Sequence, residues 1–123
     1  MARVILAIDD DPAVLDLIKT CLRNEGTVRI ANNGQAGLRL ARRHPLPDLI
    51  LLDVSLPDFD GYDICAALKQ DVLTADIPVI FLSSHSNEAS ITHGLAMGAV
   101  DYVTKPVQPA ILRARVKTHL RLR

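Results

Sequence analysis

Polar side chains that could do chemistry directly follow four short apolar runs of this sequence. They are three successive aspartates after the first run, an aspartate after the third, a serine after the fourth and a lysine after the fifth: Asp9, Asp10, Asp11, Asp53, Ser83 and Lys105. Singly, each has an ordinary explanation, since aspartate and serine often cap helices and lysine is usually solvated. Their shared position after apolar runs indicates that they belong to one site.

Carboxylates gathered in one cleft require a positive partner. Like charges a few ångströms apart, as expected for Asp9, Asp10 and Asp53, cannot all stay ionised at low cost. A hard divalent cation relieves this repulsion, and Mg²⁺ suits an open site because it binds one or two carboxylates and keeps several waters. Lys105 would add a second positive charge. We therefore predict a Mg²⁺ site.

The sequence favours phosphoryl chemistry over nucleotide binding. It has no GxxxxGK[ST] loop and no GxGxxG after the first apolar run, so sites for nucleoside triphosphates and dinucleotides are disfavoured. A carboxylate beside a metal ion and a lysine can instead attack phosphorus and form an aspartyl phosphate. The metal ion and Lys105 would neutralise the charge that builds on the equatorial oxygens during transfer.

An alternation of strands and helices is expected to position these residues. The apolar runs predict strands over residues 4–8, 27–31, 48–52, 77–82 and 100–103, and helical spacing predicts helices over about 12–24, around 36–41, around 62–68, over about 88–97 and over about 108–122. This order is typical of a single α/β domain with a doubly wound, five-stranded parallel sheet. Ligand sites in such sheets lie outside the carboxyl ends of the strands.

Length and charge exclude several classes of protein. The 123 residues can form one hydrophobic core but not two, so residues 1–123 are predicted to be one domain. Fourteen basic and fourteen acidic residues cancel, which disfavours direct nucleic-acid or membrane binding. The basic residues of the last predicted helix spread around its circumference and are interpreted as a solvated face: Arg113, Arg115, Lys117, Arg121 and Arg123.

The compartment is predicted to be the cytoplasm. No signal peptide opens the chain, and no apolar run approaches the roughly 18 residues of a membrane span. Cys21 and Cys65 lie on separate predicted helices without metal-ligand spacing, so we interpret them as reduced, buried thiols.

Four motifs, in order along the chain, resemble the receiver domain of two-component response regulators. They are Ile8-Asp9-Asp10-Asp11, then Leu52-Asp53-Val54-Ser55-Leu56-Pro57 with Asp60-Gly61, then Phe81-Leu82-Ser83, and Tyr102-Val103-Thr104-Lys105-Pro106. The resemblance covers nearly the whole chain. It implies a flavodoxin-like (βα)5 fold, Mg²⁺ as the cofactor, and a sensor histidine kinase or phosphotransfer protein as the partner.

The resemblance also implies a role for each matching residue of the metal site. Asp53 resembles the phosphoacceptor. Asp10 resembles the direct metal ligand and Asp9 the acidic partner that binds the metal through water, with the backbone carbonyl of Ser55 as a further ligand. Asp11 fits a helix cap best.

A second set of residues resembles the switch of the family. Ser83 matches the hydroxyl that turns toward the phosphoryl group, and Tyr102 the aromatic residue that changes rotamer with it. Lys105 matches the lysine that pairs with the phosphate, and its bond to Pro106 is expected to be cis. The switch would remodel the fourth helix, fifth strand and fifth helix. His85 is hypothesised to lie near the phosphoryl group and to tune its hydrolysis.

The expected function is therefore a signalling module that performs one chemical step on itself, and not an enzyme. The alternative is a Mg²⁺-dependent phosphatase with an aspartate nucleophile, but that class typically shows an Asp-x-Asp pair after the first strand and a larger cap region. A receiver-like protein that works without phosphorylation is disfavoured because every site residue is present. An output domain after Arg123, a freestanding receiver and a homodimer are all compatible with the sequence.

Overall fold

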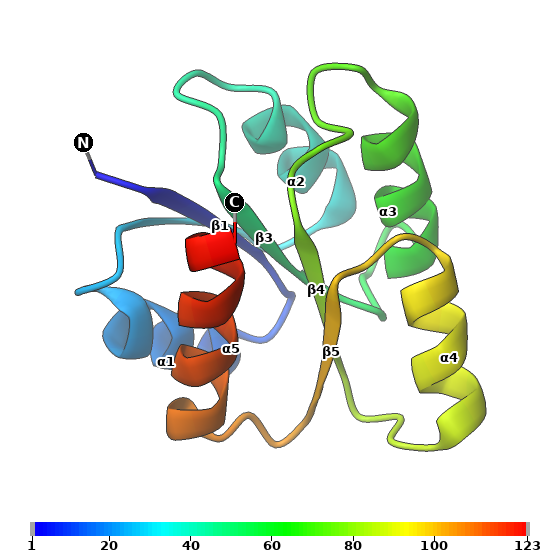
Figure 1. The fold of residues 1–123 in the computed structure, drawn as a ribbon. Coiled ribbons are helices and arrows are strands. Elements are labelled where there is room, and N and C mark those ends of the chain that lie inside the picture. The colour runs from blue at the N-terminus through cyan, green and yellow to red at the C-terminus, as the bar shows by residue number, and fades with distance from the viewer. Residues whose placement is uncertain (1, 123) are drawn as a thin grey trace.

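The chain alternates strictly between strands and helices (Figure 1). The computed structural model describes residues 2–122; Met1 and Arg123, the ends of the predicted domain, lie outside the described residues. The strands are β1 (Val4–Ile8), β2 (Thr27–Ala31), β3 (Leu49–Asp53), β4 (Val79–Ser83) and β5 (Asp101–Thr104). The helices are α1 (Pro12–Leu22), α2 (Gly34–Ala41), α3 (Gly61–Gln70), α4 (Glu88–Ala96) and α5 (Pro109–Leu122).

The strands form one parallel sheet in the order β2-β1-β3-β4-β5. The chain builds outward from β1 to β2 and then crosses back to β3, so the strand order reverses between β1 and β3. This is the doubly wound, flavodoxin-like arrangement that the sequence predicts. It brings the carboxyl ends of β1 and β3 side by side, with Ile8 opposite Leu52.

Helices cover both faces of the sheet. Figure 1 shows α1 and α5 on one side and α2, α3 and α4 on the other. The core is correspondingly in two layers: Ile18 and Leu112 lie in the layer under α1 and α5, and Ile64 and Phe81 lie in the layer under the other helices. Strands β1, β3 and β4 are buried along their whole length, which explains why they are continuous apolar runs in the sequence.

Local side chains fix the start of the helices. Asp11, Asn33, Asp60 and Asn87 are the N-caps of α1 to α4, and each side-chain oxygen accepts a hydrogen bond from an amide of the first turn. The predicted capping role of Asp11 is therefore confirmed. After α4, Gly98 takes a φ of 102°, in the left-handed region where a glycine is favoured.

Some predicted boundaries differ from the structure by one or two residues. The third strand begins and ends one residue later than predicted, so Asp53 is its last residue. The fourth begins at Val79 because the Ile77 amide closes a turn by donating to the Thr74 carbonyl, and it extends to Ser83. The first helix ends at Leu22, where the Glu25 amide donates to the Leu22 carbonyl.

Two further expectations concern cysteines and the basic helix. Cys21 and Cys65 are buried free thiols, as predicted. Several basic residues of α5 have partners within the molecule: Arg115 pairs with Asp101 at 3.3 Å, and the Arg113 Nε donates to the Cys21 carbonyl. Arg123 lies outside the described residues. Across residues 2–122, no helix combines the length and apolar character needed to span a membrane.

Candidate functional site

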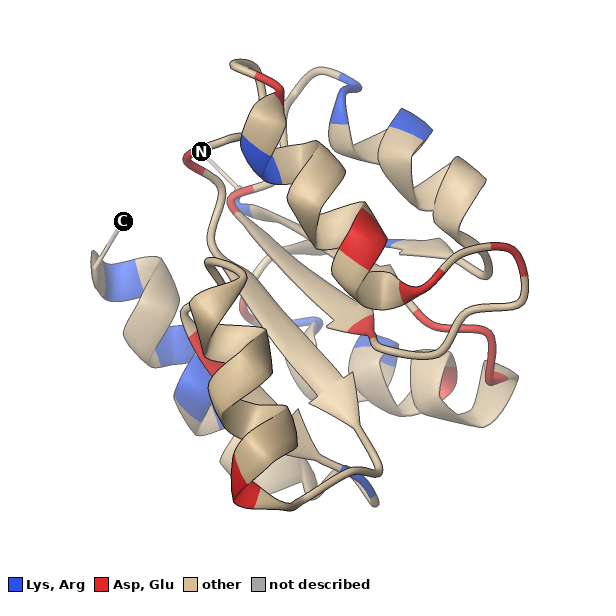
Figure 2. Ribbon diagram, turned by 90° about the vertical axis from the view of Figure 1, so that its right-hand side faces the viewer, with Lys and Arg blue, Asp and Glu red and all other residues tan. Residues whose placement is uncertain are grey.

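Three carboxylates converge at the point where the strand order reverses. Oxygens of Asp9, Asp10 and Asp53 all lie within 4.8 Å of one another. Asp9 follows β1 and Asp53 ends β3, so pairing of these strands places both side chains at the same edge of the sheet. Figure 2 shows acidic segments along the loops at this end of the strands. Asp9 and Asp53 are buried, whereas Asp10 is exposed.

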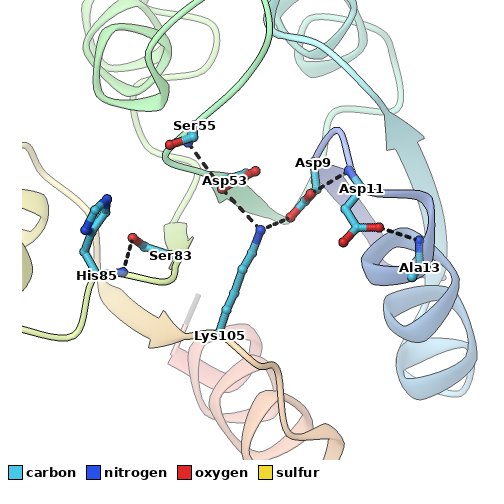
Figure 3. A network of polar contacts seen from close by, with 8 residues as sticks. All are labelled: Asp9, Asp11, Ala13, Asp53, Ser55, Ser83, His85 and Lys105. Carbon is cyan, nitrogen blue, oxygen red and sulfur yellow. Dashed lines mark hydrogen bonds and ion pairs between the residues drawn. The ribbon is translucent and has the colours of Figure 1, made fainter.

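Lys105 supplies a positive charge between two of these carboxylates. Its Nζ lies 2.9 Å from Asp9 Oδ2 and 3.4 Å from Asp53 Oδ1. Figure 3 shows the side chain extending from the residue after β5 to a point between the two carboxylates. Its backbone amide donates to the Ser83 carbonyl at 2.7 Å, and its bond to Pro106 is cis, as predicted.

Burial and repulsion make Asp53 a weaker acid than usual. Burial raises the pKa of Asp53 from 3.8 to about 6, and the neighbouring charge of Asp9 adds to this rise, while Lys105 opposes it. Burial alone would lower the pKa of Lys105, but its hydrogen bond to Asp9 and the charges of Asp53 and Asp9 raise it. The site therefore holds a carboxyl group that loses its proton less readily than usual and a lysine that stays charged.

The oxygen atoms present fit a hard divalent cation. Apart from its ion pair with Lys105, the buried Asp9 Oδ2 accepts no hydrogen bond from residues 2–122. A buried carboxylate oxygen normally has such partners, so Asp9 retains coordinating capacity. The exposed Asp10 carboxylate lies at the mouth of the same cluster. Oxygen-only ligands with room for water are what Mg²⁺ prefers.

The loop between β3 and α3 brings Ser55 beside the acidic cluster. The Ser55 amide donates to Asp53 Oδ1 at 3.3 Å (Figure 3), and Ser55 pairs with Asp60 in an isolated antiparallel bridge. The Gly61 amide donates to the Val54 carbonyl at 2.7 Å. A Cβ at Gly61 would lie 2.2 Å from the Asp53 carbonyl oxygen, so only glycine permits this close return of the chain.

The two predicted switch residues meet at the backbone of His85. The buried Ser83 hydroxyl accepts a hydrogen bond from the His85 amide at 3.0 Å, and the Tyr102 hydroxyl donates to the His85 carbonyl at 3.0 Å. Tyr102 itself is buried. Ser83 thus uses its hydroxyl within its own loop, and Figure 3 shows no contact between it and Asp53.

The His85 side chain, unlike its backbone, is not part of this arrangement. It is exposed, and Figure 3 shows no contact between its ring and Asp53. Its proposed effect on phosphoryl lifetime stays a prediction. Tyr62, which sequence analysis does not assign to the site, packs edge-on against Phe81 and His93 at ring-centroid distances of 5.0 and 4.5 Å.

Sequence reasoning misses one residue, Asp58. Its carboxylate accepts hydrogen bonds from the amides of Gly34 and Gln35 in the first turn of α2. The sequence gives only an indirect indication of this role. The first turn of α2 begins with Gly34-Gln35 and contains no acidic residue, so no local carboxylate stabilises the N-terminus of this helix. The sequence does not show that a residue 24 positions later supplies it.

A sequence model of the family described as "Response regulator receiver domain" matches residues 5–117. The chain belongs to this family. As a receiver domain it is a signalling module of two-component systems, so the alternative of a phosphatase is set aside. The receiver fold, the acidic cluster and the lysine of this chain agree with that assignment.

The receiver domain is similar to parts of longer bacterial proteins. It is 43% identical over 118 residues to the "DNA-binding dual master transcriptional regulator RpaA" of Synechocystis, covering 95% of this chain and 48% of that protein. It is 38% identical over 116 residues to a "Probable cyclic di-GMP phosphodiesterase" of Vibrio cholerae, covering 94% of this chain and 26% of that protein. The chain thus spans between a quarter and a half of these relatives.

Solved receiver domains have the same fold. The structure described as "BeF3 Activated DrrB Receiver Domain" superposes with a TM-score of 0.89 at 36% identity and covers 98% of this chain and 99% of that one.

Proposed function

We propose that Asp53 accepts a phosphoryl group from a phosphohistidine of a sensor histidine kinase or phosphotransfer protein in a Mg²⁺-dependent reaction. The observation that carries this proposal is the cluster of Asp9, Asp10 and Asp53 oxygens within 4.8 Å, with Lys105 Nζ 2.9 Å from Asp9 and 3.4 Å from Asp53. A nucleophilic carboxylate beside a fixed cation and a metal site is suited to phosphoryl transfer.

In the transfer, an Asp53 oxygen attacks phosphorus while the bond from phosphorus to the donor imidazole nitrogen breaks, and that nitrogen keeps the electron pair. Asp10, Asp9 through a water, Asp53 and the backbone carbonyl of Ser55 would hold Mg²⁺. When bound, the metal ion neutralises negative charge on the phosphoryl oxygens. Lys105, already beside Asp53, pairs with one of these oxygens once the group has arrived.

Phosphorylation then changes the partners of the switch residues. A phosphoryl group adds about −1.5 to −2 charge at pH 7 and several strong acceptors. The Ser83 hydroxyl, which accepts from the His85 amide in the unmodified domain, turns away from it and donates to a phosphoryl oxygen. Because the Tyr102 hydroxyl is hydrogen-bonded to the His85 carbonyl, movement of this loop changes the packing of Tyr102, on β5, against α4.

The surface formed by α4, β5 and α5 is proposed to pass the signal on. Leu95 of α4 and Ile111 of α5 are 43% and 44% exposed, which suits a face that contacts an output domain or a second receiver. The relatives named above are two to four times longer than this chain. We therefore propose an output domain after Arg123, a cytoplasmic location, and homodimer formation through this surface.

The similarity to activated receivers supports the phosphorylation site. Two of the matching structures are described as BeF3-activated receiver domains. Trifluoroberyllate resembles a phosphoryl group in shape and charge, so its action on similar domains is consistent with phosphorylation of Asp53 here.

Intact-protein mass spectrometry tests the proposal. Incubation with acetyl phosphate and Mg²⁺ is expected to add one phosphoryl group to the wild-type chain and none to Asp53→Asn, and excess EDTA should prevent labelling. The matched control is Asp63→Asn, which removes an exposed carboxylate of α3 outside the cluster. Labelling of Asp53→Asn at the wild-type rate would assign the phosphoacceptor elsewhere, and steady turnover of unrelated phosphomonoesters would restore the phosphatase alternative.

A further inference from the structure

The N-terminus of α2 is capped by a carboxylate from a distant loop. Asp58 Oδ1 accepts from the Gly34 amide at 2.7 Å, and Asp58 Oδ2 accepts from the Gln35 amide at 3.0 Å. Desolvation alone would raise the pKa of Asp58, but hydrogen bonds from backbone amides together lower it. The helix also has its own cap, because Asn33 Oδ1 accepts from the Ala36 amide at 2.8 Å. Two different segments therefore satisfy the first turn of α2.

Asp58 lies at the tip of the loop that carries the metal-site residue Ser55. Ser55 and Asp60 pair across the base of this loop, so Leu56 to Phe59 form its tip. Gly34 leaves space for the tip, since a Cβ there would lie 3.0 Å from the Phe59 ring and 3.2 Å from Asp58 Oδ1. The carboxylate thus fastens the far end of the loop to α2.

On the other side, the start of α2 is connected to the residues that follow β1. The Asp9 amide donates to the Ala31 carbonyl at 3.0 Å. Ala31 ends β2, and only two residues separate it from Gly34, the first residue of α2. The backbone of the metal-site residue Asp9 is therefore joined to the helix turn that Asp58 caps.

These contacts close a ring around the acidic cluster. From Asp58 the chain runs back to Ser55, whose amide donates to Asp53 Oδ1, and Asp53 shares Lys105 with Asp9. Every other connection in the ring is a strand pairing, a short stretch of backbone or a bond within the cluster. Among residues 2–122, the two bonds of Asp58 are the only side-chain hydrogen bonds that link the loop tip to the β2–α2 side.

We propose that Asp58 is a positioning residue for the Mg²⁺ site: by tying the β3–α3 loop to α2, it sets the spacing between the ligands that follow β1 and those at the end of β3. This inference rests on the proposed function, because it concerns the same metal site. Mg²⁺ tolerates little deviation from octahedral geometry, so a loop free to move away from α2 lowers affinity even though no ligand is lost.

If Asp58 acted only as a helix cap, its removal would affect the stability of α2 but not Mg²⁺ affinity. Asn33, which caps the same helix, provides the matched control. Asn33→Ala removes one cap from the same turn of α2 but leaves the loop attached, whereas Asp58→Ala removes the attachment. Both variants are expected to lower the melting temperature. Asp58→Asn keeps one acceptor oxygen and loses the other, so it is expected to fall between wild type and Asp58→Ala.

Isothermal titration calorimetry with Mg²⁺ on the folded, unphosphorylated proteins is the primary test. Removal of groups that orient metal ligands commonly costs about 10–100-fold in affinity; because Asp58 acts through a loop, we expect a smaller rise in Kd for Asp58→Ala, on the order of threefold to tenfold. Asn33→Ala should bind Mg²⁺ as wild type does. Labelling by acetyl phosphate should follow the same pattern at low Mg²⁺ and converge at saturating Mg²⁺.

Equal Mg²⁺ affinities in Asp58→Ala and Asn33→Ala would overturn the inference and leave Asp58 as a helix cap. The inference also fails if Asp58→Asn, the milder variant, binds Mg²⁺ as wild type does while its loop amides have shifted in NMR spectra. Failure of the wild-type chain to bind Mg²⁺ or to be labelled would instead reject the proposed function itself.

Discussion

The loops after β3 and β4 border the same acidic cluster but are held in very different ways. The β3–α3 loop is fastened at its base by the Ser55–Asp60 bridge and the Gly61 amide, and at its tip by Asp58. The β4–α4 loop, residues 84–87, is exposed, as are the first two residues of α4. Among residues 2–122, two hydrogen bonds tie it to the interior, and both join the His85 backbone to hydroxyl groups, those of Ser83 and Tyr102.

This contrast suggests how one small domain can combine two conflicting requirements. A metal site needs ligands at fixed positions, and a switch needs a segment with two accessible arrangements. Here the proposed metal ligands follow β1 and β3, and the weakly held segment follows β4. Changes to the first loop should therefore alter stability and metal affinity, while changes to the second should alter conformation at little cost in stability.

The largest effect is expected for Gly61→Ala in the fixed loop. The new Cβ would lie 2.2 Å from the Asp53 carbonyl oxygen and 2.7 Å from Val54 Cα, and backbone atoms cannot move aside cheaply. We expect a loss of about 3 kcal/mol or more in the free energy of unfolding, measured by urea denaturation, together with weaker Mg²⁺ binding by the folded fraction.

Gly26→Ala is the matched control for that variant. It creates a similar clash, 2.5 Å from the Arg3 carbonyl oxygen, but near the start of β1 and away from the cluster. It should destabilise the fold while the folded protein keeps its Mg²⁺ affinity. Equal losses of affinity in both variants would show that general destabilisation, and not loop geometry, controls the site.

The second-largest effect is expected from the buried carboxyl group of Asp53, at the end of β3. The folded-state pKa of Asp53, about 6, lies above its ordinary 3.8, so its contribution to stability is fully present below pH 3.8 and is lost as pH rises through 6. Without metal, this group should cost up to about 3 kcal/mol at about pH 7 relative to strongly acidic pH. Asp53→Asn should remove that slope and be the more stable protein in EDTA at neutral pH.

Denaturation curves for both proteins at several pH values, with and without Mg²⁺, provide the measurement. Mg²⁺ should stabilise wild type far more than Asp53→Asn, because bound metal offsets the carboxylate repulsion. If the stabilities of wild type and Asp53→Asn in EDTA changed with pH in the same way, the loss of stability at neutral pH could not be assigned to Asp53. Asp10→Asn should also lower the stabilisation by Mg²⁺, because it removes one carboxylate of the acidic cluster.

The contrast between the loops also marks where sequence reasoning succeeds. The strands and the convergence of Asp9, Asp53 and Lys105 follow from buried apolar runs, because the carboxyl ends of parallel strands in one sheet share one edge. The flavodoxin-like arrangement of the strands follows from the resemblance to receiver domains. The polar residues immediately after a strand, such as Asp9, are therefore predictable.

Contacts that depend on the path of a loop are not predictable in the same way. Asp58 reaches α2 across 24 residues of sequence, and nothing in its neighbourhood indicates which helix it will cap. The partner of the Ser83 hydroxyl is likewise set by the turn that follows β4. The predicted start of the fourth strand is wrong by two residues, because the Ile77 amide donates to the Thr74 carbonyl in a turn and β4 begins only at Val79.

On the weakly held side, Ser83→Ala should have a moderate effect. It removes the acceptor of the His85 amide, so we expect a loss of about 1 kcal/mol in the free energy of unfolding. Hydrogen exchange should speed up at His85 more than at Ser55. Phosphorylation should still occur on Asp53, but the amide shifts it causes in α4 and β5 should shrink; shifts of wild-type size would argue against Ser83 as the link.

The smallest change in stability is expected for Gly94→Ala, and it sharpens the contrast most. A Cβ at Gly94 in α4 would lie 2.9 Å and 3.0 Å from two atoms of the Tyr102 ring, a side chain that can move. Alanine favours the helix by about 1 kcal/mol, and displacing Tyr102 loses its hydrogen bond to His85, worth about 1 kcal/mol. These contributions offset, so the free energy of unfolding should change little.

The conformation of the switch, however, should change. NMR contacts between the Tyr102 ring and α4 should weaken, and the His85 amide should exchange faster, as in Tyr102→Phe, which removes the hydroxyl alone. If the Tyr102 ring stayed in place in Gly94→Ala while α4 moved, then α4, the β4–α4 loop and Tyr102 would form one rigid unit, and the prediction would be wrong. An added methyl group in the β3–α3 loop lowers stability because it clashes with backbone atoms. An added methyl group beside the β4–α4 loop can instead be accommodated by a new arrangement of that loop. A phosphorylation switch requires such a second arrangement.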